Sequence, residues 1–206
     1  PEGITKLQGP LEKHAGVAEQ VGDMQFLKPN NKQQQQFLKH DIIVLLRKYK
    51  RSELDFYFNR FWKVIYPVFP IFDKQDYQKT LERVFVRDKD TGMIVDMDLS
   101  ETFDLANVAI YLIMIRFSYL IIITQLKVSE LERQMITKSK ITIDFIQLAN
   151  NVLSSYKVYR KSKLALLQAL ALLKYYSIFS VEDGDGNDLS QGITTNAIIA
   201  QLALNI

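Results

Sequence analysis

The sequence contains no cysteine and only two histidines, so several kinds of chemistry are excluded or have few candidate residues. Without cysteine, the chain can form neither disulfides nor thiolate zinc sites, and it has no cysteine nucleophile. Of the two histidines, His14 and His40, only His40 beside Asp41 comes near a catalytic pattern. No serine or threonine stands at a distinctive spacing from this pair, so we expect a surface histidine.

Glycine and net charge are also scarce. The 206 residues include eight glycines, and none of them forms a glycine-rich phosphate-binding pattern. The net charge of +3 is too small to indicate nucleic-acid binding by itself. We therefore do not expect an enzyme, and we expect no cofactor, metal or catalytic site in this chain.

Apolar residues, by contrast, are abundant and reach their highest density in residues 103–126, where 18 of 24 side chains are apolar. A helix that is apolar over most of its circumference must be covered by other helices. The stretch is also long enough to cross a bilayer, where its Asp, Asn and Arg residues would be costly. Because the flanking segments are amphipathic and charged, we expect a buried core helix and no membrane contact.

Most of the remaining chain shows helical periodicity. Apolar residues recur at helical spacing in residues 37–49, 52–66, 73–85, 129–152 and 162–179, and a last helix begins near residue 194. The segment 129–152 is either one long helix or two helices with a break near 137–140. We expect an all-α domain of stacked antiparallel helical hairpins, with about seven helices, over residues 37–206. Residues 1–36, which end in NNKQQQQ, are expected to be loop-rich or poorly ordered.

Capping residues and prolines predict where the helices begin and end. Two pairs match the capping box, in which each side chain bonds the backbone N–H of the other residue: Asp98 with Glu101, and Ser129 with Glu132. Ser52 and Asp73 are the expected N-caps of the second and third helices. Two prolines favour an extended connector over residues 66–73, and a polar loop is expected over residues 87–98.

Two other patterns have both a binding and a structural interpretation. The acidic loop DGDGND, residues 183–188, resembles the start of a calcium loop, but Asp188 stands where glycine is needed and Thr194 where glutamate is needed. The basic runs RKYKR (47–51) and KVYRKSK (157–163) combine tyrosines with cations, as single-strand binding surfaces do. Both runs lie at helix boundaries, where cations stabilise the helix dipole. We expect a solvated turn and solvated helix ends.

The two most apolar helices, residues 103–126 and 162–179, either meet further helices or line a cavity for a hydrophobic small molecule. Arg116 and Gln168 interrupt their apolar surfaces and are the candidate effector-binding residues, with Arg116 suited to a carboxylate. The structural alternative is that Arg116 pairs with an internal carboxylate, such as Asp104 or Asp144. In that alternative, Gln168 bonds a neighbouring helix.

The segment FYFNRFWKVIYPVFPIFD, residues 56–73, resembles the opening of the middle homology region, or fungal-specific regulatory domain, of zinc binuclear cluster transcription factors. That family has an aromatic-rich helix, a histidine or tyrosine before proline, and an apolar-Phe-Pro-Ile-aromatic stretch. The matching residues here are Tyr57, Phe58, Phe61, Trp62, Tyr66, Pro67, Phe69, Pro70, Ile71 and Phe72. The central apolar helix, LLQALALLKYY (166–176) and AIIAQLALNI (197–206) are similar to later helices of the same family.

The resemblance implies a regulatory domain of a nuclear transcription factor that restrains or exposes an activation region. Zinc and DNA contacts would belong to a six-cysteine N-terminal cluster that is absent from this chain, and the domain would be incomplete at its C-terminal end. The partners implied are DNA through that cluster, a hydrophobic small molecule, a transcriptional coactivator or mediator, and a second copy in a homodimer. Two alternatives remain: a ligand-free helical interaction scaffold and a lipid-handling helical protein.

Overall fold

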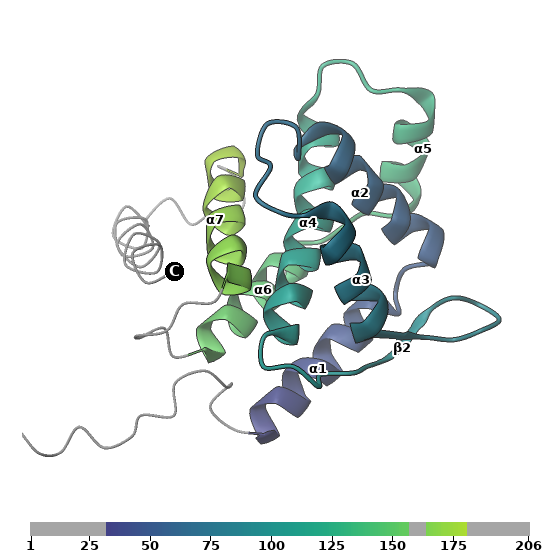
Figure 1. Ribbon diagram of the computed structural model, residues 1–206. Coiled ribbons are helices and arrows are strands. Elements are labelled where there is room, and N and C mark those ends of the chain that lie inside the picture. Colours follow the sequence, from purple (N-terminus) through teal and green to yellow (C-terminus); the bar gives the residue numbers. More distant parts are fainter. Residues whose placement is uncertain (1–31, 157–163, 181–206) are drawn as a thin grey trace, which may run out of the picture.

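Seven α-helices and a two-stranded antiparallel sheet form the part of the chain that the computed structural model describes, residues 32–156 and 164–180 (Figure 1). The helices are α1 (Lys32–Leu46), α2 (Arg51–Val64), α3 (Lys74–Val84), α4 (Asp104–Thr124), α5 (Glu130–Lys138), α6 (Asp144–Ser155) and α7 (Leu164–Phe179). The strands are β1 (Phe85–Arg87) and β2 (Ile94–Met97). The all-α expectation is confirmed, with a small hairpin added.

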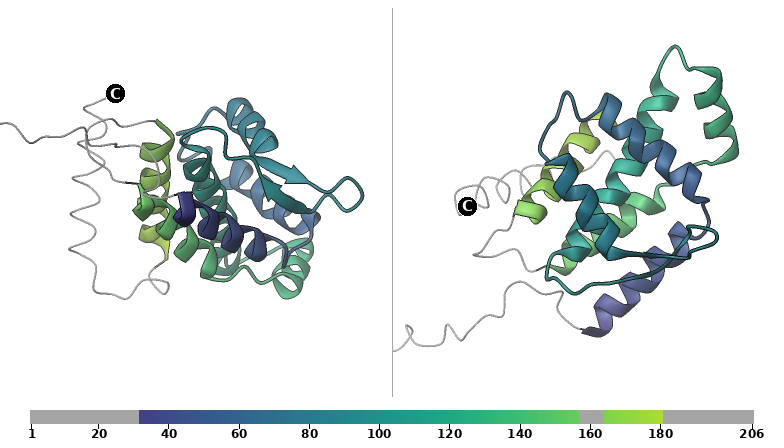
Figure 2. Two further views of the ribbon diagram at one scale, coloured as in Figure 1. Left: turned by 90° about the horizontal axis from the view of Figure 1, so that it is seen from below. Right: turned by 45° about the vertical axis from the view of Figure 1, so that its right-hand side comes forward.

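Helix α4 lies at the centre of the molecule, and α2, α3, α5, α6 and α7 all pack against it (Figures 1 and 2). Every residue from 108 to 120 is buried, because helices cover the whole circumference of this segment. By length and composition α4 is apolar enough to cross a membrane, but 83% of its most apolar window is buried inside the structure. That burial matches the core helix expected from the sequence.

Two of the four predicted caps are confirmed. The side chain of Asp73 accepts a hydrogen bond from the N–H of Asp76 at 2.9 Å. Ser129 and Glu132 form the reciprocal capping box, with a 2.9 Å bond from the N–H of Ser129 to Glu132 Oε2 and a 3.3 Å bond in return. These caps begin α3 and α5, so local sequence is sufficient to define both starts.

The other two predicted caps are wrong. Helix α4 begins at Asp104, because the N–H of Asp98 continues the hairpin and donates to Val84 O at 2.8 Å. Helix α2 begins at Arg51, one residue before the predicted Ser52 cap. There the carboxylate of Glu53 accepts from the N–H of Lys50 at 2.8 Å, which satisfies one of the free donors at the helix start.

The β-hairpin corrects the predicted loop over residues 87–98. Phe85 pairs with Met97, and both side chains are buried in the core. Gly92 at the tip has a φ of +66°, a left-handed conformation that glycine adopts without steric cost. Strands of three and four residues are too short to show a clear two-residue period. Phe85 also fits the helical spacing of the apolar residues that precede it. The sequence pattern therefore placed Phe85 in the helix and did not indicate the start of β1.

Helix α1 begins at Lys32, so it includes the four glutamines that were expected to lie in a loop. Glutamine is a good helix former, and α1 gains tertiary support because Lys39 Nζ and Arg47 Nη2 donate to the β2 carbonyls of Met97 and Val95, each at 2.6 Å. Of the two alternatives for residues 129–152, the two-helix one is correct, as α5 and α6 are separate. The basic run at 157–163, the acidic loop and the last predicted helix lie outside the described residues.

Candidate functional site

Arg116 is buried on α4 and holds the connector between α5 and α6. Its Nη1 donates to the carbonyl of Ile141, and its guanidinium lies over the ring of Tyr119, 5.2 Å from the centroid. The two carbonyls before Ile141 are also bound. Tyr57 from α2 donates to Ser139 O at 2.9 Å, and Tyr49 donates to Lys140 O at 3.0 Å. Three successive carbonyls of one connector are therefore bound by side chains from three separate parts of the fold.

The suggested pairing of Arg116 with Asp104 is wrong. The two residues are 12 positions apart on one helix, about 18 Å along its axis. Asp104 is bound instead by Arg83 of α3. The other suggested carboxylate, Asp144, accepts a 2.9 Å hydrogen bond from the hydroxyl of Thr142.

Gln168 on α7 holds a different connector, the one between α2 and α3. Its Nε2 donates to the carbonyl of Ile71 at 2.5 Å, so its partner is a connector and not the neighbouring helix that was expected. The ring of Phe69 stacks on Tyr175 of α7, with centroids 4.5 Å apart and planes 15° apart. The segment with the most specific family resemblance is thus docked along α7 by one polar and one aromatic contact.

The interface between α4 and α7, where an effector was expected, is filled by side chains from both helices. Phe117 of α4 contacts the rings of Tyr175, Tyr176 and Phe179, with centroids 5.6 to 5.7 Å apart. Since Arg116 and Gln168 donate to two different connectors, their described bonds do not converge on one apolar cavity. A ligand between these helices would have to displace aromatic side chains.

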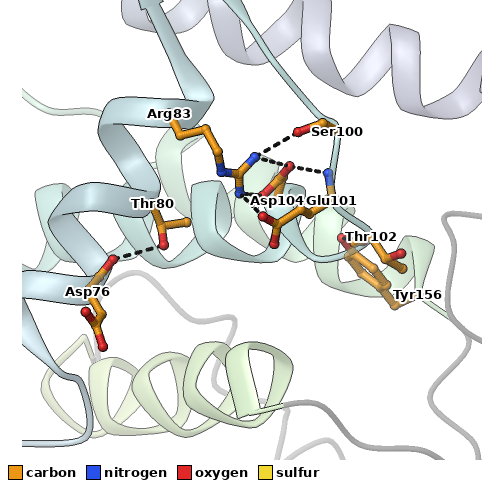
Figure 3. A network of polar contacts seen from close by, with 8 residues as sticks. All are labelled: Asp76, Thr80, Arg83, Ser100, Glu101, Thr102, Asp104 and Tyr156. Atoms are coloured by element: carbon orange, nitrogen blue, oxygen red, sulfur yellow. Dashed lines mark hydrogen bonds and ion pairs between the residues drawn. The ribbon is translucent and has the colours of Figure 1, made fainter.

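A partly buried ion pair joins α3 to the start of α4 (Figure 3). Asp104 is fully buried, and its two carboxylate oxygens lie 2.5 and 3.0 Å from the guanidinium nitrogens of Arg83. Arg83 also bonds Ser100 and Glu101, and the N–H of Glu101 donates to Asp104 at 2.7 Å. The hydrogen bond to Asp104 raises the pKa of Arg83, so the guanidinium stays charged. This network stabilises the contact between α3 and α4, and the sequence pattern did not predict that Arg83 is the partner of Asp104.

A cavity lies elsewhere, between the start of α2 and the tip of the hairpin. Its volume is about 490 Å³, and its lining residues are Lys50, Arg51, Ser52, Asp55, Thr91 and Met93. The basic run RKYKR was the sequence signal for this region, but the hairpin that completes the cavity was not predicted. His40 and Asp41 are both exposed on α1, as expected of a surface histidine.

Comparison with known proteins gives one informative similarity. The chain is 26% identical over 163 residues to multidrug resistance regulator 1 of Candida albicans, in an alignment that covers 72% of this chain and 15% of that protein. The chain therefore spans a small part of the length of that relative. No protein-family model matches the chain, and no solved structure matches it significantly.

Proposed function

We propose that this chain is part of the regulatory region of a fungal DNA-binding transcription factor. The observation that carries the proposal is the 163-residue similarity to a fungal regulator. The resemblance of residues 56–73 to the opening of the middle homology region is consistent with the same function. Under this proposal the protein acts in the nucleus, through intramolecular and partner contacts and not by catalysis. DNA and zinc would be bound by a cluster outside this chain.

The gene itself offers the first test. Six cysteines at short spacing, followed by a basic linker and a coiled-coil heptad upstream of this chain, are expected if the proposal is correct. A gene that encodes no such cluster would favour a helical interaction scaffold. A reporter assay is the second test, in which removing residues 32–180 from the full protein should change transcription from its target promoters.

A hydrophobic effector that binds between α4 and α7 is the further element of the proposal. These helices supply the apolar surface, and a ligand between them would displace the aromatic side chains that fill the interface, including Tyr175, on which Phe69 of the connector stacks. A thermal-shift screen against fatty acids and apolar drugs tests this element. A ligand at one hundred times its dissociation constant should add about 2.7 kcal/mol to stability.

The matched variants for that screen are Phe117→Leu, inside the proposed ligand site, and Leu131→Ala, which is exposed on α5. Stabilisation that is lost in Phe117→Leu and kept in Leu131→Ala supports binding between the helices. Arg116→Ala tests the suggested carboxylate contact, because a fatty acid that stabilises this variant and the parent equally makes no use of Arg116.

The scaffold alternative rests on a separate observation. Ile123, Leu126 and Leu131 are exposed around the turn between α4 and α5, and Leu126 has no burial at all. Clustered exposed apolar side chains are typical of protein contact surfaces. If no compound stabilises the protein, and Ile123→Ser with Leu131→Ser lowers reporter activity without changing the melting temperature, the scaffold alternative is favoured.

A further inference from the structure

Three segments that are distant in sequence bring cations to one corner of the molecule. They are the basic run at 47–51, residues 138–140 at the end of α5, and the tip of the hairpin, where Lys89 lies between Asp88 and Asp90. Tyr49 donates to Lys140 O at 3.0 Å, and Lys138 Nζ lies 3.7 Å from Glu53, which fixes the second segment beside the first. The right-hand view of Figure 2 brings this side of the molecule forward, with the hairpin beside the start of α2.

The hairpin tip touches the same corner, because a Cβ placed on Gly92 would lie only 2.7 Å from Cδ of Arg51. The cavity of about 490 Å³ occupies the space between them. That volume falls within the range of pockets that hold small molecules. Lys50, Arg51, Ser52 and Thr91 supply polar groups to its lining.

The acidic residues of this corner are Glu53, Asp55, Asp88 and the exposed Asp90, and the first three already have partners. Glu53 is buried and accepts from the N–H of Lys50, and Asp88 accepts from the N–H and hydroxyl of Thr91 at 2.8 and 2.7 Å. Asp55, which lines the cavity, pairs with Arg51 Nε at 3.2 Å. That bond leaves both terminal guanidinium nitrogens of Arg51 for another acceptor. Among the described ion pairs, none involves Lys48, Lys50 or Lys140.

The aromatic ring of the basic run is unavailable to a ligand. Tyr49 is 9% exposed, and its ring packs edge-on against Phe145 with centroids 5.5 Å apart. Base stacking on this tyrosine is therefore excluded, which rules out the single-strand alternative for residues 47–51 that the sequence did not favour. What the corner offers is a small cavity with Lys50 and Arg51 in its lining, and further exposed lysines, Lys48 and Lys140, on the adjoining segments. A ligand with one charge would engage one cation, whereas several linked phosphates would engage several.

We propose that this corner binds a small molecule that carries several phosphate groups. Inorganic tripolyphosphate is the probe, because it has the phosphate chemistry without a base or a sugar. Calorimetry with the 206-residue chain, at constant ionic strength and with sulfate as the reference anion, should detect one site. The variant Lys48→Gln with Lys50→Gln should weaken binding about tenfold, as expected for losing two charge-assisted contacts.

The matched control is Lys63→Gln with Lys79→Gln, which removes the same charge from exposed positions on α2 and α3 away from the corner. This control should bind as the parent does, and circular dichroism should show that both variants are folded. Equal weakening in the two variants would overturn the proposal, as would no binding to the parent. Tighter binding of a single-stranded oligonucleotide, lost in the Lys48/Lys50 variant, would also overturn it in favour of nucleic acid.

Discussion

At the scale of single residues, Asp104 is the most deeply buried charged side chain among the residues that the structure describes. A fully buried carboxylate requires a partner, and Arg83 supplies two hydrogen bonds in the geometry that suits a guanidinium. The pair connects α3 to the first turn of α4, where a negative charge also stabilises the helix dipole. The stability of the domain is therefore sensitive to either member.

We expect Arg83→Met to lower the free energy of unfolding by about 2 to 3 kcal/mol. The loss is smaller than for a fully buried pair, because the Arg83 side chain is 32% exposed. Urea unfolding monitored by circular dichroism measures the change. Arg133→Met, on the exposed face of α5, is the control and should stay within about 0.5 kcal/mol of the parent. Equal stability of both variants would mean that the folded state does not require Arg83 as the partner of the buried Asp104 carboxylate.

Trp62 is the largest side chain in the aromatic cluster between α2 and α3. It is 6% exposed, as expected from its position before the two prolines, and its ring contacts Phe58, Phe61 and Tyr66. Trp62→Ala should cost about 3 to 5 kcal/mol, because the neighbouring rings can fill the resulting cavity only in part. The exposed Val68→Ala is the control. A thermal midpoint within a degree of the parent for Trp62→Ala would contradict this placement.

Glu53 makes the free energy of unfolding depend on pH. Its burial alone would raise its pKa, but the N–H of Lys50 and the cation of Lys138 outweigh burial and hold the pKa below its usual value. A carboxylate with a lowered pKa in the folded state stabilises that state above its unfolded pKa of about 4.3. The contribution is then lost as the pH falls through the folded pKa.

Glu53→Gln should therefore reduce stability at pH 7 by about 0.5 to 1.5 kcal/mol and flatten the loss of stability between about pH 5 and pH 3. Thermal unfolding at several pH values tests this expectation. Glu82→Gln, at an exposed position on α3, should leave the pH profile unchanged. Profiles of Glu53→Gln and the parent that run parallel would show that Glu53 is not the acid-sensitive group.

At the scale of elements, connectors are held by side chains from helices that are remote in sequence. Gln168 and Tyr175 of α7 hold the connector between α2 and α3, and Arg116, Tyr57 and Tyr49 hold the one between α5 and α6. Residues that interrupt apolar helices therefore bind backbone carbonyls here. This arrangement satisfies polar groups that would otherwise be buried without a partner.

A double-mutant cycle on Phe69 and Tyr175 tests the docking of the connector. The two stacked rings should show a coupling energy of about 0.5 to 1.5 kcal/mol in urea unfolding of the single and double leucine variants. The same cycle on Phe69 and Phe56, which lies in the first half of α2, should give a coupling near zero. Additive effects of Phe69 and Tyr175 would indicate that α7 does not hold the connector.

At the scale of the whole molecule, α4 is the element against which most of the other described helices pack. Its central residues are buried on every side, and five helices pack against it. Local unfolding that exposes α4 would therefore have to disrupt most of the core. The hairpin and α5, by contrast, extend from the core toward solvent (Figure 1).

Hydrogen exchange should reflect this difference. The α4 amides from 108 to 120 are expected to exchange only through global unfolding, with the highest protection in the domain. The α5 and hairpin amides should exchange through local opening at lower free energy. Mass spectrometry of peptic fragments measures both rates, with added denaturant to identify global exchange. Exchange of α4 that is as fast as that of α5 would contradict its central position.

The sequence by itself determined the helical class, the central apolar helix, the caps of α3 and α5, and the burial of Trp62. These features depend on periodicity and on contacts between residues within one or two helical turns, which a sequence pattern records directly. Only the tertiary structure decided the short hairpin, the start of α4, and the partners of Arg116, Gln168 and Asp104. It also brought the 138–140 segment and the hairpin tip to the basic run at 47–51. Each of these features joins groups far apart in sequence, and local periodicity carries no record of which distant atom satisfies a buried charge or donor.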